Sequence, residues 1–199
     1  MGRPRAEDVK VSTPQRILEA AEKVFAEQGF GPAKLADIAE QAGIRRPSLL
    51  YHFKSKEELY QATVQRAFSN LGGVLQAAMF MDGSFEERLL ATADRYADFL
   101  GENVQVARIV LRELLDAKGP GPGTDILMNQ VAPLVDAVEA FIETQGDAIV
   151  VEGPPIRARL MSVAATLIVR AAAYGDVRDT LWGPQPHASA LSRATFLRQ

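Results

Sequence analysis

Apolar residues recur every three or four positions along most of this chain, which is the spacing of one face of an α-helix. The first such stretch follows Thr13-Pro14, a capping residue and a proline typical of a helix start, and Gly29 marks its end. Two shorter stretches follow at 34–42 and 45–53, separated by Gly43. The pattern therefore predicts three helices before residue 56.

The later helices are indicated by the residues at which they begin. The segments at 55–58 and 84–87, SKEE and SFEE, have the sequence of a capping box, in which serine and glutamate satisfy the first backbone N–H groups of a helix. They predict one helix from 56 toward 71, where Gly72-Gly73 ends or kinks it, and another from 85 to about 100. After them we expect helices at 103–118, 125–144, 155–177 and 187–197, with a GPGPG break at 119–123. Strand-like alternation is limited to 148–151, so the predicted class is all-α.

The charge distribution divides the chain near residue 56. Residues 1–56 hold ten Lys and Arg against seven Asp and Glu, a net charge of +3, and the other twelve basic and eighteen acidic residues give 57–199 a net charge of −6. A basic module on an acidic body is typical of a protein that binds a polyanion through one part. We predict a three-helix DNA-binding domain over 1–56, with 1–12 as a flexible arm, and a larger helical domain over 57–199.

The helices expected at 34–42 and 45–53, with a turn at Gly43, have the spacing of a helix-turn-helix. In this motif the second helix enters the major groove and its first residues reach the base edges. Those residues are Arg45, Arg46, Pro47 and Ser48. Arginine can bind guanine with two hydrogen bonds. Leu49 and Phe53 are expected to face inward and hold this helix on the other two.

The stretch KLADIAEQAGIRRPSLLYHFKSKEELY, residues 34–60, resembles the signature of TetR-family regulators. The matching positions are Asp37-Ile38-Ala39, Ala42-Gly43, Leu49, His52-Phe53 and Ser55-Lys56-Glu57. The first helix, RILEAAEKVFAEQGF at 16–30, resembles the opening of the same family. The resemblance covers roughly a quarter of the chain. It implies a regulator that binds double-stranded operator DNA through the helix-turn-helix.

Some positions depart from the family pattern. Ala33 and Lys34 stand where threonines usually cap the second helix, and Leu50 replaces the usual first tyrosine of the recognition helix. Arg45 takes a position that is more often small or polar, which suggests an operator preference of its own. Phosphate contacts, which fix the position of a protein on the duplex, are expected from Lys34, Tyr51, His52 and Lys56. Packing within the domain is the alternative for Tyr51, and a position at the edge of the core is the alternative for His52.

The resemblance also implies that the helices after residue 56 enclose an effector pocket and that the last long helices pair with a second copy. Large, soft or amphipathic side chains that suit an apolar pocket, and hence a small hydrophobic effector, are Met79, Phe80, Tyr96, Phe99, Met128 and Met161. Ordinary core packing is the alternative for each of them. The alanine-rich helix at 155–177 suits a homodimer interface, with Leu160, Ala164, Leu167 and Ala171 as contacts. Arg170 in the same helix is either an interface ion pair or a cation of the pocket.

Catalysis finds no positive support in the sequence. The two histidines, His52 and His187, and the absence of cysteine predict neither a metal site nor a catalytic triad, and no cofactor. Without a long apolar stretch, we expect a cytoplasmic protein with no membrane partner. The leading prediction is a homodimeric repressor that a small molecule releases from a palindromic operator. The alternatives are a DNA-binding regulator controlled by a protein partner, and a helical enzyme or interaction module.

Overall fold

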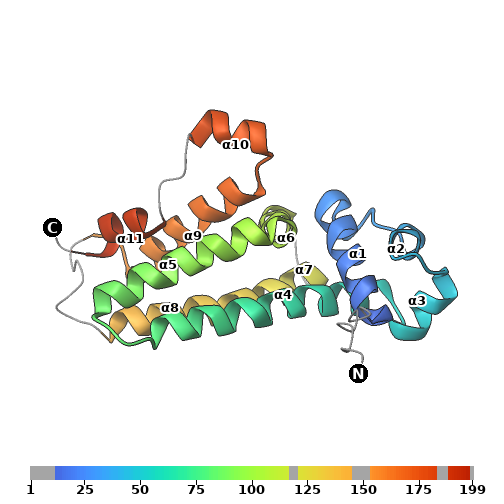
Figure 1. Ribbon diagram of the computed structural model, residues 1–199, viewed down its shortest axis with the longest axis horizontal. Coiled ribbons are helices and arrows are strands. Elements are labelled where there is room, and N and C mark those ends of the chain that lie inside the picture. The colour runs from blue at the N-terminus through green and yellow to red at the C-terminus, as the bar shows by residue number, and fades with distance from the viewer. Residues whose placement is uncertain (1–11, 117–120, 145–152, 183–187, 198–199) are drawn as a thin grey trace, which may run out of the picture. The chain divides into compact units, whose positions relative to one another are not determined.

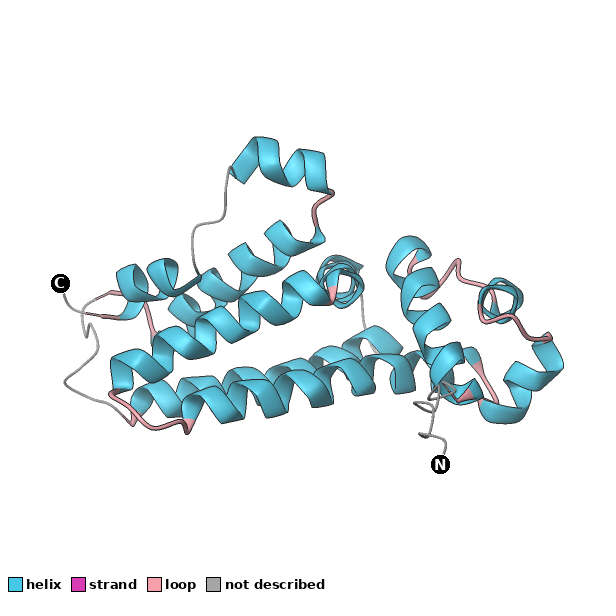
Figure 2. Cartoon of the chain, in the orientation of Figure 1, coloured by secondary structure: helices cyan, strands magenta, loops and turns pink. Residues whose placement is uncertain are grey.

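The computed structural model describes residues 12–116, 121–144, 153–182 and 188–197, and every regular element in these ranges is a helix (Figures 1 and 2). The all-α prediction is confirmed. The described residues form two compact units, one up to Thr63 and one from Val64 onward. The arm expected at 1–12 lies outside the described residues except for Ser12, and so does the segment 148–151.

The first unit holds α1 (Thr13–Gln28), α2 (Leu35–Gln41), α3 (Arg46–His52) and the first two turns of α4 (Lys56–Met79). Its core is built from apolar faces with helical spacing, and its fully buried members include Ile17, Ile38 and Leu49. The Tyr60 ring, also buried, lies 4.7 Å from the ring of Phe25 and 5.0 Å from that of Phe30. These aromatic contacts fix the start of α4 against α1.

The start of α4 is capped much as the sequence predicts. The Oγ atom of Ser55 accepts a hydrogen bond from the backbone N–H of Glu58 at 3.0 Å, while the Glu58 carboxylate accepts from the N–H of Lys54 at 2.8 Å. The helix end expected as one possibility at Gly72-Gly73 is wrong, because α4 continues to Met79. A Cβ atom at Gly72 would lie 3.3 Å from Cδ2 of Leu134, so this glycine permits a close approach of the helix that holds Leu134.

The described part of the second unit contains the rest of α4 and seven further helices. These are α5 (Phe85–Glu102), α6 (Val104–Asp116), α7 (Pro122–Ile126) with the π-helical turn η1 (Leu127–Val131), α8 (Ala132–Glu143), α9 (Ile156–Ala172), α10 (Gly175–Trp182) and α11 (Ala188–Phe196). The central helix α9 packs against α5, α6, α8 and α11. None of the helices in the described ranges has the length and apolar character needed to cross a membrane.

Two predicted helices of this unit differ from the structure. The helix expected at 125–144 is divided by the π-helical turn η1, and the helix expected at 155–177 ends at Ala172. The chain turns at Ala173, whose backbone is extended, and continues as α10, a separate helix that projects from the end of α9 (Figure 1). By contrast, the capping box at Ser84 and Glu87 is confirmed in both directions, and these hydrogen bonds lower the pKa of the Glu87 carboxyl group.

Candidate nucleic-acid interface and ligand cavity

Helix α3 has one buried face and one exposed face. Leu49 is fully buried and Phe53, just after the helix, is nearly so, as expected from the sequence. The residues predicted to reach base edges, Arg45, Arg46, Pro47 and Ser48, are all exposed, and no acidic residue lies in the first turn. The first turn of α3 thus has a polar, cationic surface of the kind that DNA base edges and phosphates bind.

The turn before α3 depends on a glycine and an arginine. Gly43 has a φ of 66°, a left-handed conformation that glycine adopts with little strain. The guanidinium group of Arg16, on α1, donates a hydrogen bond to the backbone oxygen of Ala42, at the end of α2. Because the last carbonyl groups of a helix have no partner within it, this bond closes α2 and holds the turn against α1.

Lys56 has a role that its sequence position does not reveal. Its Nζ atom donates to the backbone oxygens of Phe30 at 2.8 Å, Gly31 at 2.9 Å and Ala33 at 3.2 Å. It also lies 4.5 Å from the centre of the Phe30 ring. An ammonium group has three N–H donors, so all of them are used within the protein. The phosphate contact predicted for Lys56 therefore has no donor left in this conformation.

The other expected phosphate contacts are accessible to a partner. Lys34 is exposed at the N-cap of α2, where the described residues provide no side-chain cap, in agreement with the missing threonines. Tyr51 is 83% exposed on α3, and its ring packs edge-on at 5.3 Å against the half-buried ring of His52. For Lys34, Tyr51 and His52, phosphate contact therefore stays a prediction.

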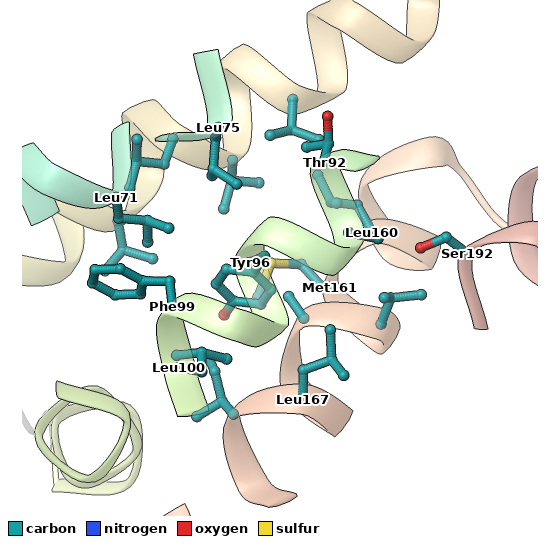
Figure 3. A pocket seen from close by; sticks show the side chains of 18 of the residues that line it. Leu71, Leu75, Thr92, Tyr96, Phe99, Leu100, Leu160, Met161, Leu167 and Ser192 are labelled. Carbon is teal, nitrogen blue, oxygen red and sulfur yellow. The ribbon is translucent and has the colours of Figure 1, made fainter. Parts of the chain in front are cut away.

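The second unit contains an apolar cavity of about 120 Å³, partly open to solvent, between α4, α5, α6, α8, α9 and α11. Figure 3 shows Leu71 and Leu75 reaching it from α4, Tyr96 and Phe99 from α5, and Met161 and Leu167 from α9. The polar side chains in its wall are Thr92, Tyr96 and Ser192. Burial raises the pKa of the Tyr96 hydroxyl well above its usual range, so this group stays protonated and can donate a hydrogen bond.

The six residues that the sequence suggests for the pocket lie in three different places in the structure. Tyr96, Phe99 and Met161 line the cavity. Met79 and Phe80 line a neighbouring open hollow, while Met128 is exposed and lines neither space. The sequence analysis missed Arg88 in the hollow and Thr92 in the cavity. A signal for both was present, since Arg88, Thr92 and Tyr96 recur every four residues on one face of α5.

Of the four residues predicted for a dimer interface, Leu167 is buried and the other three are half-buried. Leu160, Ala164 and Leu167 line the cavity, and Ala171 is half-buried. Arg170 is buried as well, within the unit itself. The exposed large apolar residues of this region lie at the end of α9 and on α10, namely Val169, Tyr174, Val177 and Leu181.

A family model described as bacterial regulatory proteins, tetR family, matches residues 17–63, which span α1 to the first turns of α4. The transcriptional activator FasR of Mycolicibacterium smegmatis is 35% identical over 95 residues, covering 48% of this chain and 43% of FasR. This chain therefore spans less than half of that relative.

Two further matches extend beyond the helix-turn-helix. The uncharacterized transcriptional regulator TtgW of Pseudomonas putida is 32% identical over 119 residues, covering 60% of this chain and 87% of TtgW. A TetR-like transcriptional regulator of Rhodococcus sp. RHA1 has the same fold, with a TM-score of 0.68, 19% identity and coverage of 97% of this chain and 98% of its own. These relatives are named as transcriptional regulators and not as enzymes. The chain belongs to the TetR family of bacterial regulatory proteins.

Proposed function

We propose that this chain is a homodimeric regulator that binds a palindromic operator through α3 and is released by an apolar effector bound in its second unit. The observation that supports this proposal most is the pairing of two features in one TetR-family chain. One is the exposed cationic start of α3, seated on the unit by the buried Leu49, and the other is the apolar cavity.

On the DNA, the exposed residues divide into two roles. Arg45, Arg46 and Ser48 at the start of α3 reach base edges and select the sequence. Lys34 and Tyr51 bind phosphates and fix the register without reading bases. His52, half-buried beside Tyr51, supports the same phosphate contact.

A second copy would bind at the end of α9 and on α10. None of the described residues of α10 is buried, although Val177 and Leu181 are apolar and at least half exposed. Burying them against the same surface of another copy would form a symmetric interface. The test is to measure the molecular mass of the Leu181→Glu variant in solution. We expect this variant to be monomeric and Met81→Glu, an exposed apolar residue between α4 and α5, to remain dimeric. A dimeric Leu181→Glu variant would place the interface elsewhere.

The effector would act by changing which conformation the dimer prefers. A cavity of about 120 Å³ is close in size to an engineered cavity of about 150 Å³ that binds benzene, so a larger molecule must displace side chains to enter. The displaced side chains belong to six helices, and their movement can change the separation of the two α3 helices in a dimer. Couplings of this kind typically lower the second affinity by about 5- to 150-fold.

The proposed direction of regulation is repression. A protein that a small molecule releases from its operator is suited to blocking a promoter until that molecule is present. FasR, whose name makes it an activator, makes activation the second candidate. The position of the operator separates the two. An operator overlapping a promoter supports repression, and an operator upstream of the promoter with lower transcription in a deletion strain supports activation.

The central experiment is selection and sequencing of genomic fragments bound by the purified protein at near-physiological salt. The proposal predicts an enriched palindrome with two half-sites about 34–36 Å apart, or a multiple of one helical turn. The double variant Arg45→Ala/Arg46→Ala serves as the control and should no longer enrich the palindrome. The double variant Glu57→Gln/Glu58→Gln should still enrich it. If wild type and the Arg45→Ala/Arg46→Ala variant select the same fragments, α3 is not the recognition helix.

A further inference from the structure

We propose that the effector is an amphipathic anion whose charged group is bound by Arg88 and whose apolar part occupies the cavity. This inference rests on the proposed function, since it takes the cavity of the second unit to be the effector site. It adds the chemical class of the ligand, which the cavity alone does not define because its wall is almost entirely apolar.

Arg88 lines an open hollow that adjoins the cavity. The hollow has a volume of about 580 Å³ and is formed by α4, α5 and α8. Leu75, Leu134 and Val138 belong to the walls of both spaces, so the two spaces adjoin at these side chains. Neither space has an aspartate or a glutamate among its described lining residues. A cationic ligand would therefore meet Arg88 without any compensating carboxylate.

The guanidinium group of Arg88 is poorly satisfied by the protein. Its Nε atom is buried and has no hydrogen-bond partner among the described residues, and its Nη1 atom reaches the backbone oxygen of Met79 only at 3.5 Å. The group lies 5.5 Å from the centre of the Phe141 ring. A buried polar group without a partner is unfavourable. A carboxylate or phosphate is the acceptor that best matches a guanidinium, because both can accept two parallel hydrogen bonds.

The two spaces together fit a molecule with a polar end and an apolar body. Arg88, Thr92 and Tyr96 lie at successive turns on one face of α5, and the helix rises about 12 Å from the first to the last. The Thr92 hydroxyl already donates to the backbone oxygen of Arg88 at 2.8 Å, whereas Tyr96 lies deep in the cavity wall. An extended acyl chain of roughly decanoate length covers this span. The cavity alone is smaller than the usual range of about 300–1,000 Å³ for ligand sites, but the cavity and the hollow together fall within it.

The test compares three probes that share one chain and differ in charge. The affinities of the full-length protein for dodecanoate, dodecanol and dodecyltrimethylammonium are measured by calorimetry below the concentrations at which the probes aggregate. We expect dodecanoate to bind about ten- to a hundredfold more tightly than dodecanol, the gain of a charge-assisted hydrogen bond in a partly buried site. The cation should bind most weakly. This comparison needs no variant, so it does not depend on the folding of a mutant.

Substitutions then test whether Arg88 causes the difference between the affinities for dodecanoate and dodecanol. Arg88→Gln should bind dodecanoate and dodecanol equally, and Arg88→Lys should keep part of the preference for the anion. Arg95→Gln is the matched control, because Arg95 is exposed on the same helix and lines neither space, and it should bind as wild type does. Equal affinity of wild type for dodecanoate and dodecanol overturns the proposal. So does undetectable binding of dodecanoate, or an equal loss in Arg95→Gln.

The same probes, added to the protein on its operator, separate this inference from the proposed function. Release by dodecanoate and dodecanol alike would keep the ligand-released regulator and overturn the anion site. Binding of dodecanoate that depends on Arg88, without any change in DNA affinity, would keep the anion site and overturn the proposed release.

Discussion

Replacing Lys56 with alanine distinguishes two roles for a residue that the sequence assigns to DNA. The position within the signature predicts a phosphate contact, while the structure uses all three N–H donors of the ammonium group on the backbone oxygens of Phe30, Gly31 and Ala33. These three bonds hold the segment between α1 and α2 to the start of α4. We therefore expect Lys56 to contribute mainly to the stability of the first unit.

The size of the effect can be worked out from these contacts. A hydrogen bond to a charged group contributes about 1.5–3 kcal/mol, but one of the three is exposed and two are part-buried, so water replaces much of each when the side chain is removed. The contact with the Phe30 ring adds about 0.5–1 kcal/mol at an exposed site. A loss of about 2 kcal/mol in the free energy of unfolding is the expected total.

Lys34→Ala is the matched control, since it removes the same charge from the same unit but no contact that the structure shows. Both variants are compared with wild type by chemical denaturation and by operator affinity at several salt concentrations. Lys56→Ala should be less stable and keep the salt dependence of wild type. Lys34→Ala should keep its stability within about 0.5 kcal/mol and lose about one unit of salt slope. The reasoning is refuted if Lys56→Ala is as stable as wild type and has the lower slope.

Three further substitutions, two of them with a matched control, have defined outcomes. Arg46→Ala should relax the preference for one base pair by about 1–3 kcal/mol, measured with operators altered at single positions; a uniform loss across all of them would indicate a phosphate contact instead. Gly43→Ala should lower the free energy of unfolding by about 1–2 kcal/mol, because φ is 66° and the new Cβ atom would lie 3.0 Å from the side chain of Arg16. Gly31→Ala, with no atom within 4 Å, should be neutral in the same denaturation experiment. Ala164→Phe should fill the cavity and weaken effector binding at least about tenfold, while Ala165→Phe, on the exposed face of α9, should leave the affinity unchanged in calorimetry.

The helices of the first unit were predictable because each has a local signal. Pro14 near the start of α1, Gly29 at its end, Gly43 in the turn and Ser55 before α4 all act through the backbone of their own segment. The inward direction of Leu49 follows from the helical repeat alone.

The second unit was less predictable because its breaks depend on packing. Gly72-Gly73 indicates a helix end, but α4 continues through it, and Leu134 of α8 lies so close that a Cβ atom at Gly72 would be 3.3 Å from it. Conversely, α9 ends without any glycine or proline, in the run of alanines 171–173. There the Nε atom of Arg108, on α6, donates to the backbone oxygen of Ala172 at 3.1 Å, and its guanidinium group lies 4.3 Å from the centre of the Tyr174 ring. This partner lies 64 residues away in the sequence and leaves no local signal.

The cationic side chains show why residue type and register are not enough to locate a binding site. Arg16 lies beside a backbone oxygen at the end of α2, and Lys56 lies among three backbone oxygens in the segment before α2. Each side chain donates its hydrogen bonds to these oxygens. Arg46 has no such group beside it among the described residues, and the buried Nε atom of Arg88 has no acceptor. A cation is available to a ligand only when the chain itself provides no acceptor for it. Because those acceptors come from segments distant in sequence, the division between structural and ligand-binding cations becomes visible only in three dimensions.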